Sequence, residues 1–278
     1  MPLYTTTTNT RGLLPDGYGP LVVQPFMEAS VAALVSTTVT TPANRYRIPV
    51  VTADPTAAFV AEGAEIPISD PTLAELVVTP AKVAGLTIVS RELADDSDPA
   101  AANVVGAGLA RDIARRVDEA FFGSVAAPAP SGLGALSGVQ TYVNASAFTN
   151  LDFAAEAISK AETVGAGVTA FVTNPATALA LAKVKQATGS NAPLLGADPT
   201  AATSRSVLGV PLYVSASVAA NTLWALDSSR VWLVLREDTT VEADRSVYFT
   251  SDRVAVRATM RVGFGLVHPQ AVVKVTIA

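Results

Sequence analysis

The stretch that decides the fold runs from Ala57 to Ser97 and reads AAFVAEGAEIPISDPTLAELVVTPAKVAGLTIVSRELADDS. It begins with short apolar pieces on both sides of Glu62-Gly63, and Asp70-Pro71 then predicts a turn. Two longer apolar runs follow, Leu73–Val78 and Val83–Val89, and a proline lies between them. Because proline cannot donate to a strand ladder, the pattern predicts two separate strands.

Residues 51–82 predict an unusually long hairpin. Its two arms of about 16 residues would reach on the order of 50 Å at about 3.3 Å per residue. A compact globule of this chain length has a radius of gyration of about 19 Å. An isolated two-stranded ribbon is marginal in water, so its apolar side chains need a surface; they are Phe59, Val60, Ile66, Leu73, Leu76 and Val78. Spacing alone is equally compatible with a hairpin folded onto its own core and with one laid on a neighbouring copy.

The composition favours extensive burial between proteins. Half of the 278 residues are hydrophobic, only 15% are charged, and the mean hydropathy is +0.38. Two uncharged windows, 163–182 and 206–226, reach the length of a membrane span, but proline, glycine and polar residues interrupt both. We therefore expect no membrane span and a large protein–protein interface.

Charge and rare residue types exclude several classes of function. A net charge of −5 argues against a protein that reads nucleic-acid sequence, although a mildly acidic wall can still enclose DNA. The chain contains no cysteine, which rules out disulfides and thiolate metal sites. His268 is the sole histidine, and no GxSxG or GxxxxGK[ST] motif accompanies it. We expect His268 to be structural, and we expect no catalytic residue, no cofactor and no metal.

The rest of the chain predicts a mixture of helices and strands. Helical spacing predicts a short helix over 24–35, and alternation predicts a strand over 46–51. A helix over 99–122 follows Ser97-Asp98-Pro99, and Gly123 stands where a C-terminal cap belongs. Glycines within that helix lead us to expect close backbone packing. Its predicted apolar face consists of Val105, Leu109, Ile113, Val117 and Phe121.

Residues 126–138 are rich in proline and glycine and predict a junction between domains. Helices and strands then alternate. The predicted helices cover 151–164 and 175–187, and the predicted strands cover 168–173, 207–214, 223–226 and 231–235. Residues 241–277 are rich in strand-forming residues.

The succession FVAEGA-IP-SDPT-…-P-K-…-VSRELADDS resembles the extended loop and the start of the long helix in the HK97-fold major capsid proteins of tailed bacteriophages. The resemblance implies an α+β, HK97-like capsid fold with an N-terminal arm, an extended β-hairpin loop, a peripheral domain with a long spine helix, and an axial α/β domain. The implied divisions are an arm and lead-in strand over 1–50, an extended loop over 51–82, a peripheral domain over 83–138 with the spine helix at about 99–122, an axial domain over 139–238, and return strands of the peripheral domain over 239–278.

The resemblance also implies a function. Copies of such a protein self-assemble into the icosahedral head shell of a tailed bacteriophage (Caudoviricetes), which encloses packaged double-stranded DNA. The implied partners are identical subunits in hexamers and pentamers, a portal, scaffolding or decoration proteins, and packaged DNA contacted non-specifically. No signal-peptide pattern opens the chain, so we expect assembly in the host bacterial cytoplasm before the protein enters the virion. The alternative is an encapsulin-type compartment, which uses the same fold to house an enzyme cargo. A soluble α/β enzyme over 151–240 lacks a supporting polar constellation.

The residues expected at the interface between subunits lie on the loop and the long helix. On the loop they are Phe59, Glu62, Glu65, Ile66, Leu73 and Leu76; next along the chain are Arg91 and Glu92; on the helix they are Arg111, Arg115 and Arg116. We expect acidic loop residues to pair with arginines of a neighbour. The alternative is a solvated surface, on which each ion pair is worth about 0–1 kcal/mol.

Some members of this family join their subunits through an isopeptide bond made by a loop lysine. Residues 51–81 contain no lysine, and Lys82 lies at the base of the loop. We therefore expect no autocatalytic cross-link in this protein.

Overall fold

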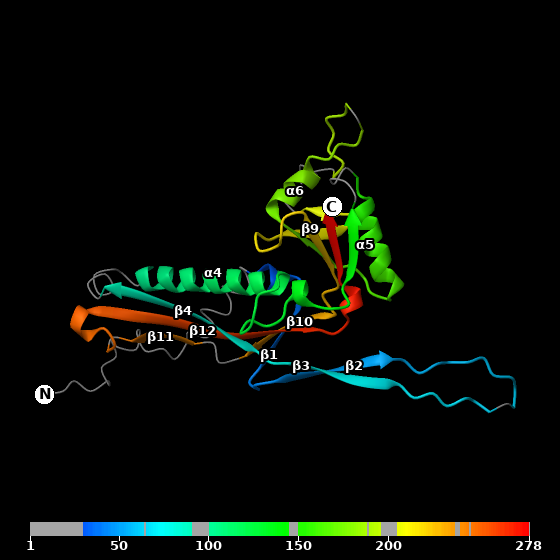
Figure 1. The fold of residues 1–278 in the computed structure, drawn as a ribbon, viewed down its shortest axis with the longest axis horizontal. Helices are drawn as coiled ribbons and strands as arrows, with labels where there is room; N and C mark the ends of the chain where they lie inside the picture. Colours follow the sequence, from blue (N-terminus) through cyan, green and yellow to red (C-terminus); the bar gives the residue numbers. More distant parts are fainter. Residues whose placement is uncertain are drawn as a thin grey trace.

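The computed structural model describes residues 30–63, 65–90, 100–144, 150–187, 189–195, 205–236, 240–244 and 246–277. They form a five-stranded sheet, a six-stranded sheet and a two-stranded ribbon that projects beyond both (Figure 1).

The five-stranded sheet is built around one long strand, β12 (Arg253–Leu266). β4 (Ala81–Ser90) pairs antiparallel along one edge of β12. On the other edge, β10 (Val231–Arg236) and β11 (Thr240–Asp244) pair with successive parts of the same strand. β1 (Thr37–Thr41) then pairs parallel with β10 and completes the sheet.

Helix α4 (Ala100–Phe122) lies along one face of this sheet (Figure 1). The predicted apolar face is confirmed, because Ile113, Val117 and Phe121 are buried while Val105 and Leu109 are half-buried. Ile113 and Val117 pack against three residues of the sheet, Leu233, Met260 and Val262. The predicted start at Ser97-Asp98-Pro99 lies outside the described residues.

The close approach between α4 and the sheet comes from a glycine of the strand. A methyl group on Gly85 of β4 would lie 3.0 Å from Cδ2 of Leu109. At Gly108, the nearest atom to such a methyl group is in the Arg111 side chain at 3.9 Å. The expectation of close backbone packing is therefore wrong for Gly108, and a small residue in the sheet serves that purpose instead.

The six-stranded sheet has the order β5 (Gln140–Asn144), β13 (Val273–Ile277), β9 (Thr222–Leu226), β6 (Ala170–Thr173), β8 (Val210–Val214) and β7 (Ser206–Val207). Helices α5 (Asp152–Thr163) and α6 (Pro175–Ala182) contribute Phe153, Ala157 and Leu181 to the core on one face. Asn174 caps α6 by accepting a hydrogen bond from the backbone N–H of Ala176. Both helices were predicted, and α6 ends earlier than expected.

The expected division at residue 238 is wrong for two strands. β10, expected in the axial block, pairs with β1 and β12 in the five-stranded sheet. β13, expected among the peripheral return strands, pairs with β5 and β9 in the six-stranded sheet. A short run of buried apolar residues fits the middle of either sheet equally well, so strand pattern alone does not assign it.

Three local predictions also need correction. The predicted strand over 207–214 is interrupted at Leu208-Gly209, where both residues have positive φ and join β7 to β8 by a tight turn. The predicted helix over 24–35 does not run through Ser30, which is extended and caps the short α2 (Val31–Leu34); its earlier part lies outside the described residues. Gly123 is not among the glycines with positive φ, so it does not form the left-handed cap that was predicted.

Candidate subunit interface

The predicted hairpin is present as the ribbon of β2 (Tyr46–Ala53) and β3 (Thr72–Val78). The strands are antiparallel, and their pairing begins at Tyr46 opposite Val78, so the paired base starts before residue 51. Residues 54–63 and 65–71 belong to the hairpin and make no strand pairing, and Gly63 turns the chain with φ +80°. Figure 1 shows the hairpin leaving the body beside the five-stranded sheet and extending beyond both sheets.

Several large apolar side chains of this hairpin are exposed in the part of the subunit that the structure describes. Phe59 is fully exposed, at 111% of its reference area, and Ile68 is 92% exposed. Ile66 and Leu73 are 75% and 68% exposed. Leu76 differs from the other loop residues predicted at the interface, because it is half-buried and packs on the hairpin base. An isolated apolar ribbon of this kind is unstable in water unless another surface covers it.

Two of the acidic residues predicted at the interface, Glu62 and Glu65, are exposed. Glu62 and Glu65 make no ion pair with any described residue. Glu75, by contrast, pairs with Arg47 across the hairpin, with 3.2 Å between Nη1 and Oε1. Arg91 and Glu92 lie outside the described residues.

The three arginines predicted at the interface lie on the exposed face of α4. Two have acidic partners within the helix: Arg115 with Asp112 at 3.9 Å, and Arg116 with Glu119 at 2.9 Å. Arg111 makes no ion pair with a described residue. The hairpin base packs on the sheet face opposite α4, so one subunit does not bring its hairpin tip to these arginines. Pairs between hairpin tip and α4 therefore require two copies.

A buried carboxylate that sequence reasoning missed ties the start of the described chain to α4. Asp118 is 5% exposed and accepts hydrogen bonds from Ser30 Oγ at 2.6 Å and from the backbone N–H groups of Val31 and Ala32 at 3.0 Å each. A hydrogen bond from the Ser215 hydroxyl adds a contact from the segment after β8. Burial raises the pKa of Asp118, and the four hydrogen bonds oppose that shift. Asp118 thus joins three distant segments.

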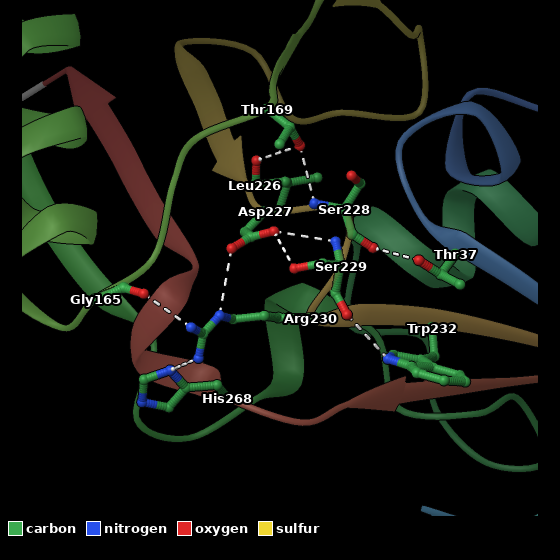
Figure 2. A network of polar contacts seen from close by, with 10 residues as sticks. All are labelled: Thr37, Gly165, Thr169, Leu226, Asp227, Ser228, Ser229, Arg230, Trp232 and His268. Carbon is green, nitrogen blue, oxygen red and sulfur yellow. Dashed lines mark hydrogen bonds and ion pairs between the residues drawn. The ribbon is translucent and has the colours of Figure 1, made fainter.

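The two sheets are joined by a polar network around Arg230 (Figure 2). Its Nε lies 3.3 Å from Oδ2 of Asp227, in the turn between β9 and β10. Its Nη2 donates to the Gly165 carbonyl at 2.8 Å, and its Nη1 donates to Nδ1 of His268 at 3.0 Å. Because His268 follows β12 and precedes β13, one guanidinium group holds two of the connections between the sheets, the one from β9 to β10 and the one from β12 to β13.

This arrangement assigns a structural role to His268. Since an arginine always donates, Nδ1 of His268 accepts, which requires a neutral ring with its proton on Nε2. Burial and, secondly, the charge of Arg230 lower the pKa of His268. The hydrogen bond from Arg230 and the lowered pKa both indicate that His268 is neutral in the folded protein, where it links the β12–β13 connection to Arg230.

Acidification is expected to weaken this network. The folded-state pKa of His268 lies below the unfolded value of 6.5, so the contribution of His268 to stability is complete above about pH 6.5 and falls as the pH drops towards the folded pKa. Melting temperatures of the wild type and of His268→Gln, measured between pH 8 and about pH 5, should converge on the acidic side. Equal pH slopes for the two proteins would contradict this assignment.

No described helix has the length and apolar character that crossing a membrane requires. Among the described residues, no group of acidic or histidine side chains could hold a metal ion.

Comparison with known proteins identifies the fold. No curated protein matches the sequence. A structure from Microbacterium phage Oxtober96 is 22% identical, with a TM-score of 0.76 over 90% of this chain and 91% of that chain. One from Mycobacterium phage Cain is 21% identical, with a TM-score of 0.75 over 90% of both chains. The capsid of an empty GTA particle is 19% identical, with a TM-score of 0.74 over 100% of this chain and 95% of that chain.

These likenesses confirm the predicted α+β, HK97-like fold. The sequence model of the phage capsid family matches residues 14–277, which is nearly the whole sequence. The chain therefore belongs to the phage capsid family.

Proposed function

We propose that this chain is a major capsid protein whose copies self-assemble into the icosahedral head shell that encloses packaged double-stranded DNA. One observation carries the proposal: a member of the phage capsid family extends a hairpin on which Phe59, Ile66 and Ile68 are largely exposed in the described part of the subunit. A second copy of the same chain covers these side chains.

The activity in this proposal is assembly, without making or breaking covalent bonds. A contact worth about 4 kcal/mol corresponds to millimolar affinity. A closed symmetric shell repeats such contacts several times for each subunit, so weak contacts add up to a stable particle while errors can still dissociate. A portal and scaffolding or decoration proteins complete the proposed set of partners.

The two sheets have different places in this proposal. The five-stranded sheet with α4 forms the peripheral part of the subunit, and the six-stranded sheet with α5 and α6 forms the axial part near the centre of each hexamer or pentamer. The hairpin leaves beside the peripheral part and reaches the adjacent subunit. Figure 1 supports this division, because the two sheets form separate lobes.

Charge supports a contact between the hairpin tip and a basic surface. Residues 51–71 contain four acidic residues and no lysine or arginine: Asp54, Glu62, Glu65 and Asp70. The exposed face of α4 carries Arg111, Arg115 and Arg116, of which Arg111 makes no ion pair with a described residue. We infer that the tip of one subunit approaches such a surface on its neighbour, where opposite charges favour the correct partner and register.

Electron microscopy of the purified protein and of particles released by a productive infection tests the proposal directly. Closed shells that contain nuclease-protected DNA after a productive infection are the expected result. Shells that hold a protein cargo and no DNA would favour the encapsulin-type alternative. A stable monomer with its hairpin folded onto its own body would overturn both.

Replacing Phe59 with aspartate is expected to impair assembly while leaving the isolated subunit intact. Phe59 is fully exposed in the subunit, whereas burying a phenylalanine in a contact contributes about 1.5–3 kcal/mol. Each contact should therefore weaken at least about tenfold. The yield of shells after density-gradient sedimentation measures this effect. Phe59→Leu is the matched control, since it keeps an apolar side chain and should still assemble.

A further inference from the structure

The base of the hairpin is seated on the five-stranded sheet, on the face opposite α4. Ile48 of β2 and Val78 of β3 are 5% and 3% exposed and pack with Val234 of β10. Beside Val234 in the register lies Gly263 of β12, and beside Trp232 lies Gly265. The hairpin therefore rests where β12 presents two residues without side chains.

The space at these glycines is already filled by the hairpin. A methyl group on Gly263 would lie 2.7 Å from Cγ1 of Val78 and 3.2 Å from Cα of Pro80. One on Gly265 would lie 2.9 Å from Cδ1 of Ile48 and 3.0 Å from Cγ2 of Val78. Cβ contacts below 3.0 Å do not occur in practice, so a larger residue at Gly263 would displace Val78 and press on the backbone of Pro80 at the hairpin base.

An aromatic pair borders the place where Ile48 and Val78 pack against Gly263 and Gly265, which we call the seat. Tyr46 of β2 lies against Trp232, with ring centroids 6.3 Å apart. The Trp232 ring is itself held by a hydrogen bond from Nε1 to the Ser229 carbonyl at 3.2 Å, next to the Arg230 network (Figure 2). The seat is thus continuous with the connection between the sheets.

A small change at the seat is magnified at the tip. From Ile48 to Glu62, 14 residues of extended chain reach about 46 Å. A tilt of about 5° at the base therefore moves the tip by about 4 Å, which is about the distance between packed carbon atoms. The direction of the hairpin must be set at its base if its tip is to meet a neighbour.

We propose that Gly263 and Gly265 are positioning residues for assembly: their missing side chains form the seat that fixes the direction in which the hairpin leaves its subunit. This inference rests on the proposed function. In the shell, that direction sets the angle between neighbouring subunits and hence the diameter of the particle.

The test compares Gly263→Ala, Val78→Ala and the double variant with the wild type. Gly263→Ala should lower the fraction of particles with the wild-type diameter about tenfold, because the added methyl group displaces Val78. In the double variant, the Val78 methyl groups that meet the new side chain are gone, so at least half of the wild-type fraction should return. Electron microscopy measures the diameters, and far-UV circular dichroism verifies the fold.

Gly85→Ala is the matched control. It introduces a similarly tight contact, 3.0 Å from Leu109, but on the α4 face of the same sheet. It should lower the melting temperature without changing the diameter of the shells that form. The inference is wrong if Gly263→Ala lowers the melting temperature without changing the diameter of the shells. It is also wrong if adding Val78→Ala to Gly263→Ala does not restore shells of the wild-type diameter.

Val78→Ala alone keeps the inference testable if Gly263→Ala does not fold. It empties the seat without a steric conflict, so the distribution of diameters should broaden, and hydrogen exchange in residues 46–53 and 72–78 should accelerate. An unchanged distribution would overturn the inference. A wild-type protein that forms no shells would instead refute the proposed function, which keeps the two failures distinct.

Discussion

Replacing Gly132 with alanine is expected to destabilise the subunit by about 3 kcal/mol or more. The loop after α4 folds back against the last turn of the helix, and Gly134 N–H donates to the Gly123 carbonyl at 3.1 Å. A methyl group on Gly132 would lie 1.9 Å from the Ala120 carbonyl oxygen and 2.6 Å from that of Phe121. These are backbone atoms of a packed helix, so the loop must move instead.

Differential scanning calorimetry measures this effect as a fall in melting temperature of about 6–12 °C. Gly167→Ala is the matched control, because no atom lies within 4 Å of the added methyl group and the residue does not have positive φ. The free energy of unfolding of the control should stay within about 0.5 kcal/mol of the wild-type value. A Gly132→Ala protein with wild-type stability would show that the loop is not held against the helix.

Asp118→Asn is expected to lower the free energy of unfolding of the subunit by about 2–3 kcal/mol at neutral pH. The two carboxylate oxygens accept hydrogen bonds from Ser30, Val31 and Ala32. An asparagine has only one acceptor oxygen, so its NH₂ group would face at least one of these donors in a buried site. The start of the described chain should then detach from α4, because Asp118 is the acceptor that holds it.

Asp112→Asn on the exposed face of the same helix is the matched control. Its partner Arg115 is 3.9 Å away and both side chains are exposed, so the loss should be below about 0.5 kcal/mol. Calorimetry gives the stability, and hydrogen exchange in residues 30–35 reports detachment of the segment. Equal losses for the two variants would contradict the role given to Asp118.

The sequence predicts the hairpin and the long helix well because both depend on local patterns. Asp70-Pro71 and the proline between the two apolar runs mark the ends of strands, and apolar residues four apart mark the buried face of α4. The exposure of Phe59 and Ile66 agrees with the resemblance to an extended loop, whereas spacing alone left open a hairpin folded onto its own core.

Pairing between distant segments could not be predicted in this way. The patterns of β10 and β13 do not assign them to one sheet or the other, because both strands are short and bury apolar residues. Asp118 occupies a helix position with the same spacing as surface residues, and only the arrival of Ser30 explains its burial. Gly263 and Gly265 carried a detectable signal, two glycines within a strand, which marks a close approach by another backbone or side chain.

The order in which the strands are made differs from the order in which they pair. β13, at residues 273–277, lies between β5 and β9, which the ribosome completes far earlier. Until β13 leaves the exit tunnel, β5 lacks its partner among the described strands and the six-stranded sheet stays open. A polypeptide interrupted before residue 273 therefore cannot form the lobe built on this sheet.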